Sequence, residues 1–112
     1  MKYYHHSFLL KLSPLLSNPN AHRVLDLATG NGIIMRKLKR LRPDLSVIGV
    51  DVSLSMLHEA AELNKTEGIT CELIESDISA LPNSLGLFDA ITSGFFFAHV
   101  MTKGTLYDIM KT

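Results

Sequence analysis

Cysteine is nearly absent from the sequence, because Cys71 is the single thiol in 112 residues. One cysteine excludes an intrachain disulfide and any metal site built from several cysteines. The adjacent histidines His5 and His6 form too short a run to indicate a metal cluster. We therefore expect no bound metal.

A charge imbalance is also absent, since eleven basic residues match eleven acidic ones. This neutrality gives no electrostatic reason to expect a nucleic-acid or membrane partner. Five of the basic residues cluster at positions 36–42, where an RNA-facing patch is one interpretation. We favour a solvated helix face, because Leu38 and Leu41 turn the other side of that helix inward.

Long hydrophobic runs are lacking as well. The longest apolar stretch lies around residues 94–101, far short of the roughly 18 residues that a membrane span requires. At the start of the chain, Lys11 interrupts the one apolar segment that could serve as a secretory signal. We therefore expect a soluble, cytoplasmic protein.

The composition that remains is typical of a folded domain. Hydrophobic residues make up 46% of the chain and charged residues 20%, which indicates a globular protein. The length suits one small domain. Turn-forming residues at 14 and 18–20 divide the chain into an N-terminal helix and loop over 1–21 and a main domain over 22–112.

Strands and helices alternate along the main domain. Apolar runs predict buried strands at 23–29, 46–52, 70–76 and 88–94. Helical spacing predicts helices between the first three strands. Turn-forming residues predict a loop over 77–86, and a last helix is expected over 101–110. The residues expected to face inward are Ile34, Leu38 and Leu41 in the first of these helices and Leu57, Ala60, Ala61 and Asn64 in the second. The alternation predicts an α/β fold with a parallel sheet of about four strands and flanking helices.

The turn after the first strand carries the most chemical information. Its glycines, Gly30 and Gly32, can adopt positive φ and let a ligand approach the backbone, and the next helix offers free N–H groups to an anion. Asp51 ends the second strand 21 residues after Gly30, near the spacing of an acid that binds ribose hydroxyls. Asp26 and Asp77 belong to the same edge of the sheet. These features predict a nucleotide-like ligand with an anionic part.

A missing third glycine narrows the choice of nucleotide. Dinucleotide sites prefer G-x-G-x-x-G, but Met35 occupies the third glycine position here, which argues against NAD or FAD. The pattern G-x-x-x-x-G-K-[ST] of a P-loop is also absent.

Four segments, in order, resemble the motifs of class I S-adenosylmethionine-dependent methyltransferases. They are residues 24–32 (VLDLATGNG), 47–57 (VIGVDVSLSML), 76–82 (SDISALP) and 88–91 (FDAI). The first two segments are similar to small-molecule methyltransferases of the ubiquinone and menaquinone biosynthesis type. The resemblance implies a Rossmann-like fold, the cofactor S-adenosyl-L-methionine and a small-molecule methyl acceptor.

The first and fourth motifs imply the methionine side of the cofactor site. By this resemblance Gly30 and Gly32 would face the methionine portion, with Ala28 at the family's first glycine position. Asp26 would help to place the ammonium group, and Ser93 would lie beside the sulfonium. Methyl transfer is then an in-line displacement that mainly needs donor and acceptor to be positioned.

The second and third motifs imply the adenosine side. Asp51 would hold the ribose, while Val52 and Met56 would flank the adenine. Asp77 would accept from the adenine amino group, and the backbone of Ile78 would contact the ring. No catalytic base is assigned. His99 could act as a general base, but it could instead be a partly buried helix residue. The three phenylalanines at 95–97 could line an acceptor pocket or fill the core.

The chain departs from the family in its length. The family's full sheet has seven strands and ends in an antiparallel hairpin, so this chain looks like an N-terminal, cofactor-binding part that is incomplete at its C-terminus. An exposed edge on the fourth strand would favour a homodimer. Two alternatives stay open: a non-catalytic cofactor-binding or interaction module, and an NAD-binding oxidoreductase fragment, which Met35 disfavours.

Overall fold

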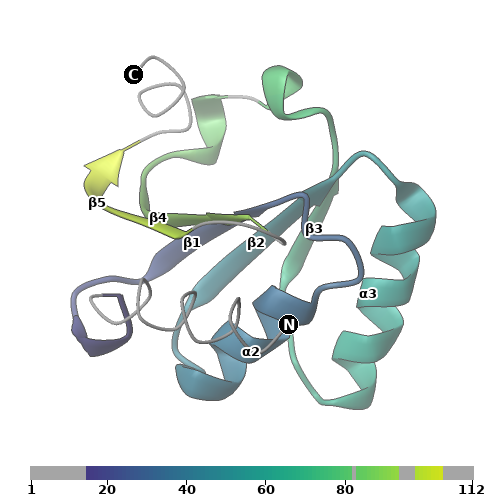
Figure 1. Ribbon diagram of the computed structural model, residues 1–112, viewed down its shortest axis with the longest axis horizontal. Helices are drawn as coiled ribbons and strands as arrows, with labels where there is room; N and C mark the ends of the chain where they lie inside the picture. Colours follow the sequence, from purple (N-terminus) through teal and green to yellow (C-terminus); the bar gives the residue numbers. More distant parts are fainter. Residues whose placement is uncertain (1–14, 82, 94–97, 105–112) are drawn as a thin grey trace.

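The protein is described by a computed structural model covering residues 15–81, 83–93 and 98–104. A five-stranded sheet in the order β3-β2-β1-β4-β5 forms its centre (Figure 1). Four of the strands are parallel, which confirms the predicted α/β architecture. They are β1 (Arg23–Leu27), β2 (Ser46–Asp51), β3 (Glu72–Glu75) and β4 (Phe88–Ser93).

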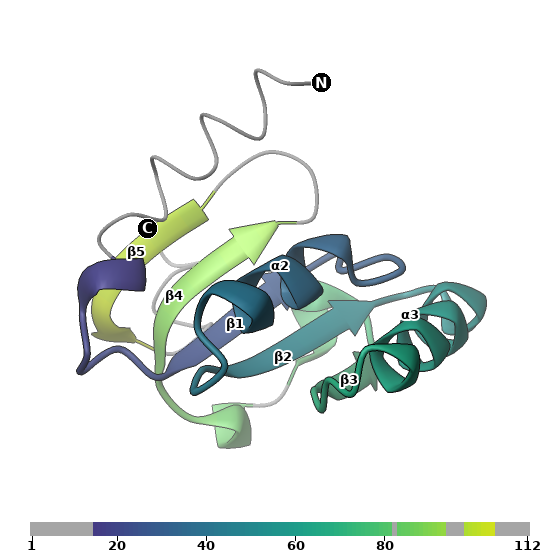
Figure 2. The same cartoon turned by 90° about the horizontal axis from the view of Figure 1, so that it is seen from below.

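The fifth strand, β5 (Ala98–Gly104), runs antiparallel along β4 and corrects the prediction for this part of the chain (Figure 2). A helix was expected from residue 101, so that prediction is wrong for 101–104, and 105–110 lie outside the described residues. The β-branched Val100 and Thr102 suit a strand, and β4 has an outer edge to pair. The outer strands are therefore β3 and β5. The prediction that β4 has an open edge is wrong, because β5 pairs with it.

Two helices cover one face of the sheet (Figure 1). In α2 (Ile33–Leu41), Met35 and Leu38 pack with Val24 and Val47 in one core cluster. Next to it, α3 (Leu54–Thr66) packs on β2 and β3. The expected inward residues are confirmed as Ile34, Leu38, Leu57, Ala60 and Asn64, whereas Leu41 and Ala61 are exposed. Leu41 ends its helix, and the buried stripe of α3 is too narrow to include Ala61.

The opposite face of the sheet is covered by the segment between β3 and β4. Two short 3₁₀ turns, η1 (Ile78–Ala80) and η2 (Asn83–Leu85), interrupt what was predicted to be a loop. Successive side chains of a strand point to opposite faces, so Leu25 belongs to this second cluster although Val24 belongs to the first. Phe88 is the largest side chain buried there.

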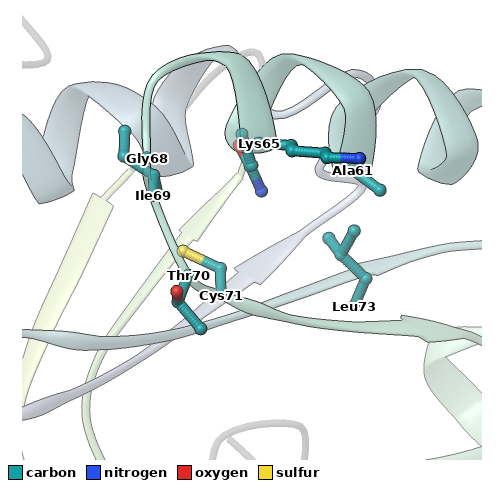
Figure 3. Close-up of a pocket in the computed structure, with 8 residues that line it drawn as sticks. Ala61, Lys65, Gly68, Ile69, Thr70, Cys71 and Leu73 are labelled. Carbon is teal, nitrogen blue, oxygen red and sulfur yellow. The ribbon is translucent and has the colours of Figure 1, made fainter.

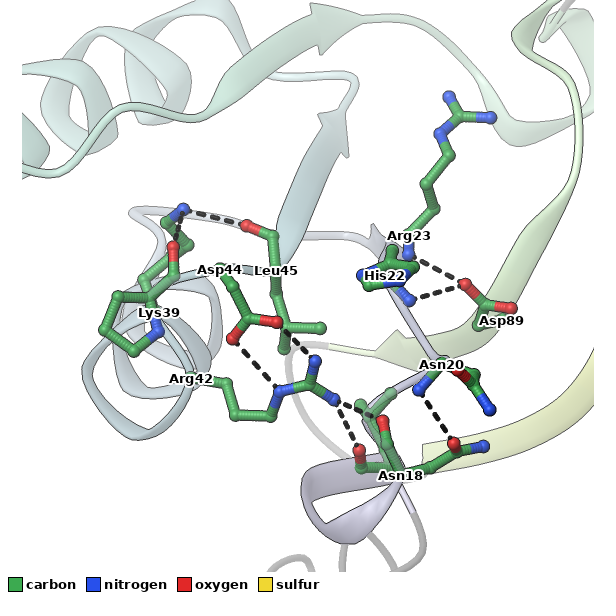
Figure 4. Close-up of polar contacts among 11 residues, drawn as sticks. Asn18, Asn20, His22, Arg23, Lys39, Arg42, Asp44, Leu45 and Asp89 are labelled. Carbon is green, nitrogen blue, oxygen red and sulfur yellow. Dashed lines mark hydrogen bonds and ion pairs between the residues drawn. The ribbon is translucent and has the colours of Figure 1, made fainter.

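Polar contacts join the start of β1 to its surroundings (Figure 4). Asp89 accepts from the backbone N–H groups of His22 and Arg23 at 2.7 and 2.9 Å. Arg42 donates to the carbonyls of Leu15 and Asn18 at 2.9 and 2.8 Å. Residues 15–17 are helical, while 1–14, which carry most of the predicted N-terminal helix, lie outside the described residues.

The basic run at 36–42 is also used within the fold. Lys39 donates to the carbonyls of Pro43 and Leu45, both at 2.8 Å, and Arg40 forms an ion pair with Glu67. Arg36 is 4% exposed, so the solvated-face interpretation is wrong for this residue.

Candidate functional site

The loop between β1 and α2 adopts a left-handed backbone at three positions. Ala28, Gly30 and Gly32 have φ values of 52°, 57° and 86°. For Ala28 this conformation costs about 1–2 kcal/mol, because its Cβ approaches the following carbonyl. The N–H of Thr29 donates to the Val50 carbonyl at 2.9 Å, which fixes the loop against the end of β2.

Asp26 lies beneath this loop and is fully buried. Its two carboxylate oxygens accept from the hydroxyls of Thr29 at 2.7 Å and Thr92 at 2.6 Å. Burial raises the pKa of Asp26 above its ordinary value, while the two hydroxyl donors oppose that rise. Asp26 therefore ties the glycine loop to the end of β4.

Asp51 connects the loop to the start of α3. Its Oδ2 accepts from the Gly30 N–H and its Oδ1 accepts from the Ser53 N–H, both at 2.9 Å. Ser53 in turn caps α3, since its hydroxyl accepts from the Met56 N–H at 3.3 Å. A carboxylate has about four acceptor positions, so these two bonds leave acceptor capacity on Asp51.

A pocket of about 220 Å³ opens where β1, β2 and β3 end. Asp77, at its rim, accepts from the N–H and hydroxyl of Ser79 at 3.0 and 2.9 Å, and these bonds lower the pKa of its carboxyl. The pocket therefore presents a second acid, Asp77, beside Asp51. Its lining residues are Ala28, Val50, Asp51, Val52, Ser76, Asp77 and Ile78.

The structure brings five of the predicted site residues together in that pocket, namely Ala28, Asp51, Val52, Asp77 and Ile78. Met56 is close by, because a Cβ built on Gly30 would lie 3.4 Å from its terminal methyl carbon. Ser93 ends β4 in register with Leu27. Gly32 begins α2. Asp26 is covered by the loop rather than exposed at its surface.

Four polar residues escaped the sequence argument. Thr29 and Thr92 hold Asp26, and Ser76 lines the pocket. Thr29 lies inside the glycine motif, and this position could have indicated that it contributes to the site. Arg36 is buried beneath the loop, although its sequence neighbours indicated a solvated cation.

A second, larger hollow lies at the other end of β3 (Figure 3). It has a volume of about 420 Å³ and lies between the end of α3, with Lys65, and the residues that lead into β3, with Cys71. Burial raises the pKa of the Cys71 thiol. None of the predicted site residues lines this hollow, so the carboxyl edge remains the candidate site.

The described residues contain no group of three or more histidine, cysteine or acidic side chains arranged to hold a metal ion. Among the helices of this described part, none is long and apolar enough to cross a membrane.

A parallel α/β sheet with a glycine loop after β1 and acids after β2 and β3 defines the Rossmann-like class of nucleotide-binding folds. Within that class, residues 24–111 match the family described as a methyltransferase domain. The chain belongs to this family of class I S-adenosylmethionine-dependent methyltransferases.

Individual relatives agree with this assignment. A demethylmenaquinone methyltransferase of Thermus thermophilus is 40% identical over 92 residues, which cover 79% of this chain and 42% of the relative. The N-terminal domain of EvdMO1, solved with SAH bound, is 32% identical, with a TM-score of 0.60 over 65% of this chain and 31% of that one. The YcgJ protein of Bacillus subtilis is 27% identical, with a TM-score of 0.62 over 80% and 37%. The chain thus spans about two fifths of the curated relative.

Proposed function

We propose that this chain binds S-adenosylmethionine at the carboxyl edge of its sheet and serves methyl transfer to a small molecule. The observation that carries the proposal is the position of Asp51. Its carboxylate joins the glycine loop to the start of α3 and also lines the 220 Å³ pocket. A nucleoside in that pocket would meet an acid with acceptor capacity for ribose hydroxyls.

The adenine half of the cofactor would occupy the rest of the pocket. Val52 is 67% exposed, so its side chain is available to cover one side of a planar base. Ile78 also belongs to the lining, and Met56 of α3 lies close to Gly30. The ionised Asp77 would accept from the exocyclic amino group. Apolar walls with a few acceptors at the rim are what an adenosine moiety requires.

The methionine half would lie over the glycine loop. Gly30 and Gly32 allow its close approach, and the first turn of α2 contains no acid to oppose a carboxylate. Ser93 and Ala28 would border the sulfonium. We assign Asp26 an indirect part in placing the ammonium group, because its buried carboxylate acts through Thr29 and Thr92.

The bound cofactor would supply a methyl group that positive sulfur already activates. The residues of this chain would hold that group in line with the acceptor, which is a positioning task. A base is needed only if the acceptor must lose a proton, and we assign none. Demethylmenaquinone is the first acceptor to test, since it appears in the name of the Thermus relative.

Calorimetric titration with S-adenosylhomocysteine tests the binding half of this proposal, with NADH as the control ligand. We expect saturable binding of S-adenosylhomocysteine alone. Absence of binding, or equal binding of NADH, would contradict the proposed cofactor. Transfer of labelled methyl to demethylmenaquinone tests the catalytic half. Tight binding without transfer to any acceptor in a broad panel would favour a non-catalytic binding module instead.

Replacing Asp51 makes the proposal specific to one residue. Asp51→Asn should weaken S-adenosylhomocysteine binding by about 1–3 kcal/mol, because one carboxylate oxygen becomes an amide nitrogen that cannot accept from a ribose hydroxyl. The matched control is Glu75→Gln, which changes the neighbouring strand end in register with Asp51 but not the pocket lining. Equal dissociation constants for Asp51→Asn and the unaltered chain would remove Asp51 from the site.

A further inference from the structure

Arg36 is a cation buried at the junction of α2, α3 and the glycine loop. It is 4% exposed. Its Nη1 donates to the carbonyl oxygen of Asn31 at 2.7 Å and to the Oδ1 of Asn64 at 3.1 Å. Its Nε lies 3.7 Å from a carboxylate oxygen of Glu67 near the end of α3. A guanidinium is costly to bury unless such partners surround it. Here the partners come from the glycine loop and from α3 and its C-terminal end.

The partners of Arg36 are themselves held in place. Asn64 is 4% exposed. Its side-chain amide donates to the Met35 sulfur at 3.4 Å, and its backbone carbonyl accepts from the N–H of Ile69 at 2.8 Å. Burial lowers the pKa of Arg36 from its ordinary value, and the charge of Glu67 opposes that change. Arginine nonetheless stays protonated in proteins, so its donors remain available.

The head group of Arg36 lies close to the backbone of Gly32. A Cβ built on Gly32 would lie 2.7 Å from the Nη1 of Arg36, which is nearer than nonbonded atoms approach. The left-handed φ of 86° favours glycine at this position, and a Cβ there would also displace the guanidinium from its present position. The polar head of Arg36 therefore lies directly against the loop backbone.

The peptide that joins Asn31 to Gly32 is held at both ends. Its carbonyl accepts from Arg36 at 2.7 Å, and its N–H donates to the Thr29 carbonyl at 2.9 Å. The preceding Gly30 N–H donates to Asp51 at 2.9 Å. Arg36 holds this peptide from the helix side, as Asp51 holds the loop from the strand side.

We propose that Arg36 is a positioning residue for the cofactor site: it orients the peptide between Asn31 and Gly32 and so keeps the loop ready to receive the methionine part of the cofactor. The effect on cofactor affinity rests on the proposed function, whereas the ordering of the loop does not. Small displacements of groups that orient a ligand have large effects on its binding and reaction. A loop that is already ordered also loses less conformational entropy when the ligand binds.

Two measurements on the full chain separate these parts. Amide hydrogen exchange of residues 30–32 without ligand reports the order of the loop. Titration with S-adenosylhomocysteine reports affinity. In Arg36→Met, which keeps the length of the side chain but removes its donors, we expect exchange at 30–32 to be about tenfold faster and the dissociation constant about tenfold higher. Arg36→Lys should recover part of both effects, because lysine retains a charged donor.

Two control variants distinguish positioning from general stability. Leu38→Ala weakens the same helix from a fully buried position, and Glu67→Gln removes the charge that faces Arg36 without touching the loop. Both should lower the melting temperature while exchange at 30–32 and the dissociation constant stay within about twofold of the unaltered chain.

The inference is overturned if Arg36→Met melts earlier but leaves loop exchange and affinity unchanged, or if Leu38→Ala changes them equally. Should Arg36→Met fail to fold, the same comparison is made with Arg36→Lys, for which unchanged loop exchange and affinity would also contradict the proposal. If the unaltered chain does not bind S-adenosylhomocysteine, the proposed function fails, and the exchange data alone decide whether Arg36 orders the loop.

Discussion

At the scale of single residues, the candidate site depends on two acids in different surroundings. Asp51 is partly exposed and accepts from backbone N–H groups on two elements. Asp26 is fully buried and accepts from two hydroxyls. Both carboxylates therefore hold the glycine loop, and only Asp51 also lines the pocket.

The buried acid predicts a pH dependence of stability. Burial raises the pKa of Asp26 in the folded chain above its value in the unfolded chain. Between these two values the folded state binds more protons than the unfolded state, so this group makes stability fall as the pH rises through that window. Asp26→Asn should flatten this part of the profile, as urea unfolding from pH 4 to 7 would show. Profiles of identical slope would contradict the assignment.

The two acids were predictable from the sequence to different degrees. Their positions at strand ends followed from apolar runs that stop at an acid, and the structure places Asp51 at the end of β2, in the pocket lining. The burial of Asp26 under Thr29 and Thr92 was not predictable, because Thr92 lies 66 residues away. Arg36 was mistaken for a surface cation for the same reason, since its partner Asn64 lies 28 residues further along the chain.

At the scale of elements, the sequence pattern predicted the strands and helices whose formation depends mainly on nearby residues. The four parallel strands and both helices follow from apolar periodicity. The fifth strand was missed because its stability comes from pairing with β4, a nonlocal contact. Strand preference depends strongly on such context. The 3₁₀ turns η1 and η2 likewise follow from packing of Ile78 and Leu85 on the sheet.

The spacing between α2 and β2 gives a prediction at this scale. Gly49 of β2 lies beneath the glycine loop, and a Cβ built on it would lie 2.5 Å from the Met35 methyl carbon and 2.9 Å from the Thr29 hydroxyl. Gly49→Ala should therefore destabilise the fold by about 1–3 kcal/mol through overpacking. Because Thr29 would have to move, S-adenosylhomocysteine affinity should fall as well. Urea unfolding and titration measure both; unchanged values would show that the loop is not packed against β2 in this way.

At the scale of the whole molecule, the sheet order determines where a ligand can bind. The chain builds β1, β2 and β3 outward in one direction and then returns to place β4 on the other side of β1. Ligands of open parallel sheets bind at the carboxyl edge beside such a reversal. The glycine loop, Asp51 and the end of β4 all meet there. The hollow between α3 and β3 is larger, but it lies at the opposite end of the strands.

A crystal structure of the chain with S-adenosylhomocysteine tests the central claim most directly. The account predicts the ribose hydroxyls within hydrogen-bonding distance of the Asp51 carboxylate, the adenine between Val52 and Ile78, and the methionine part over Gly30 and Gly32. Ligand bound in the hollow beside Cys71, or bound at the sheet edge without contact to Asp51, would contradict it.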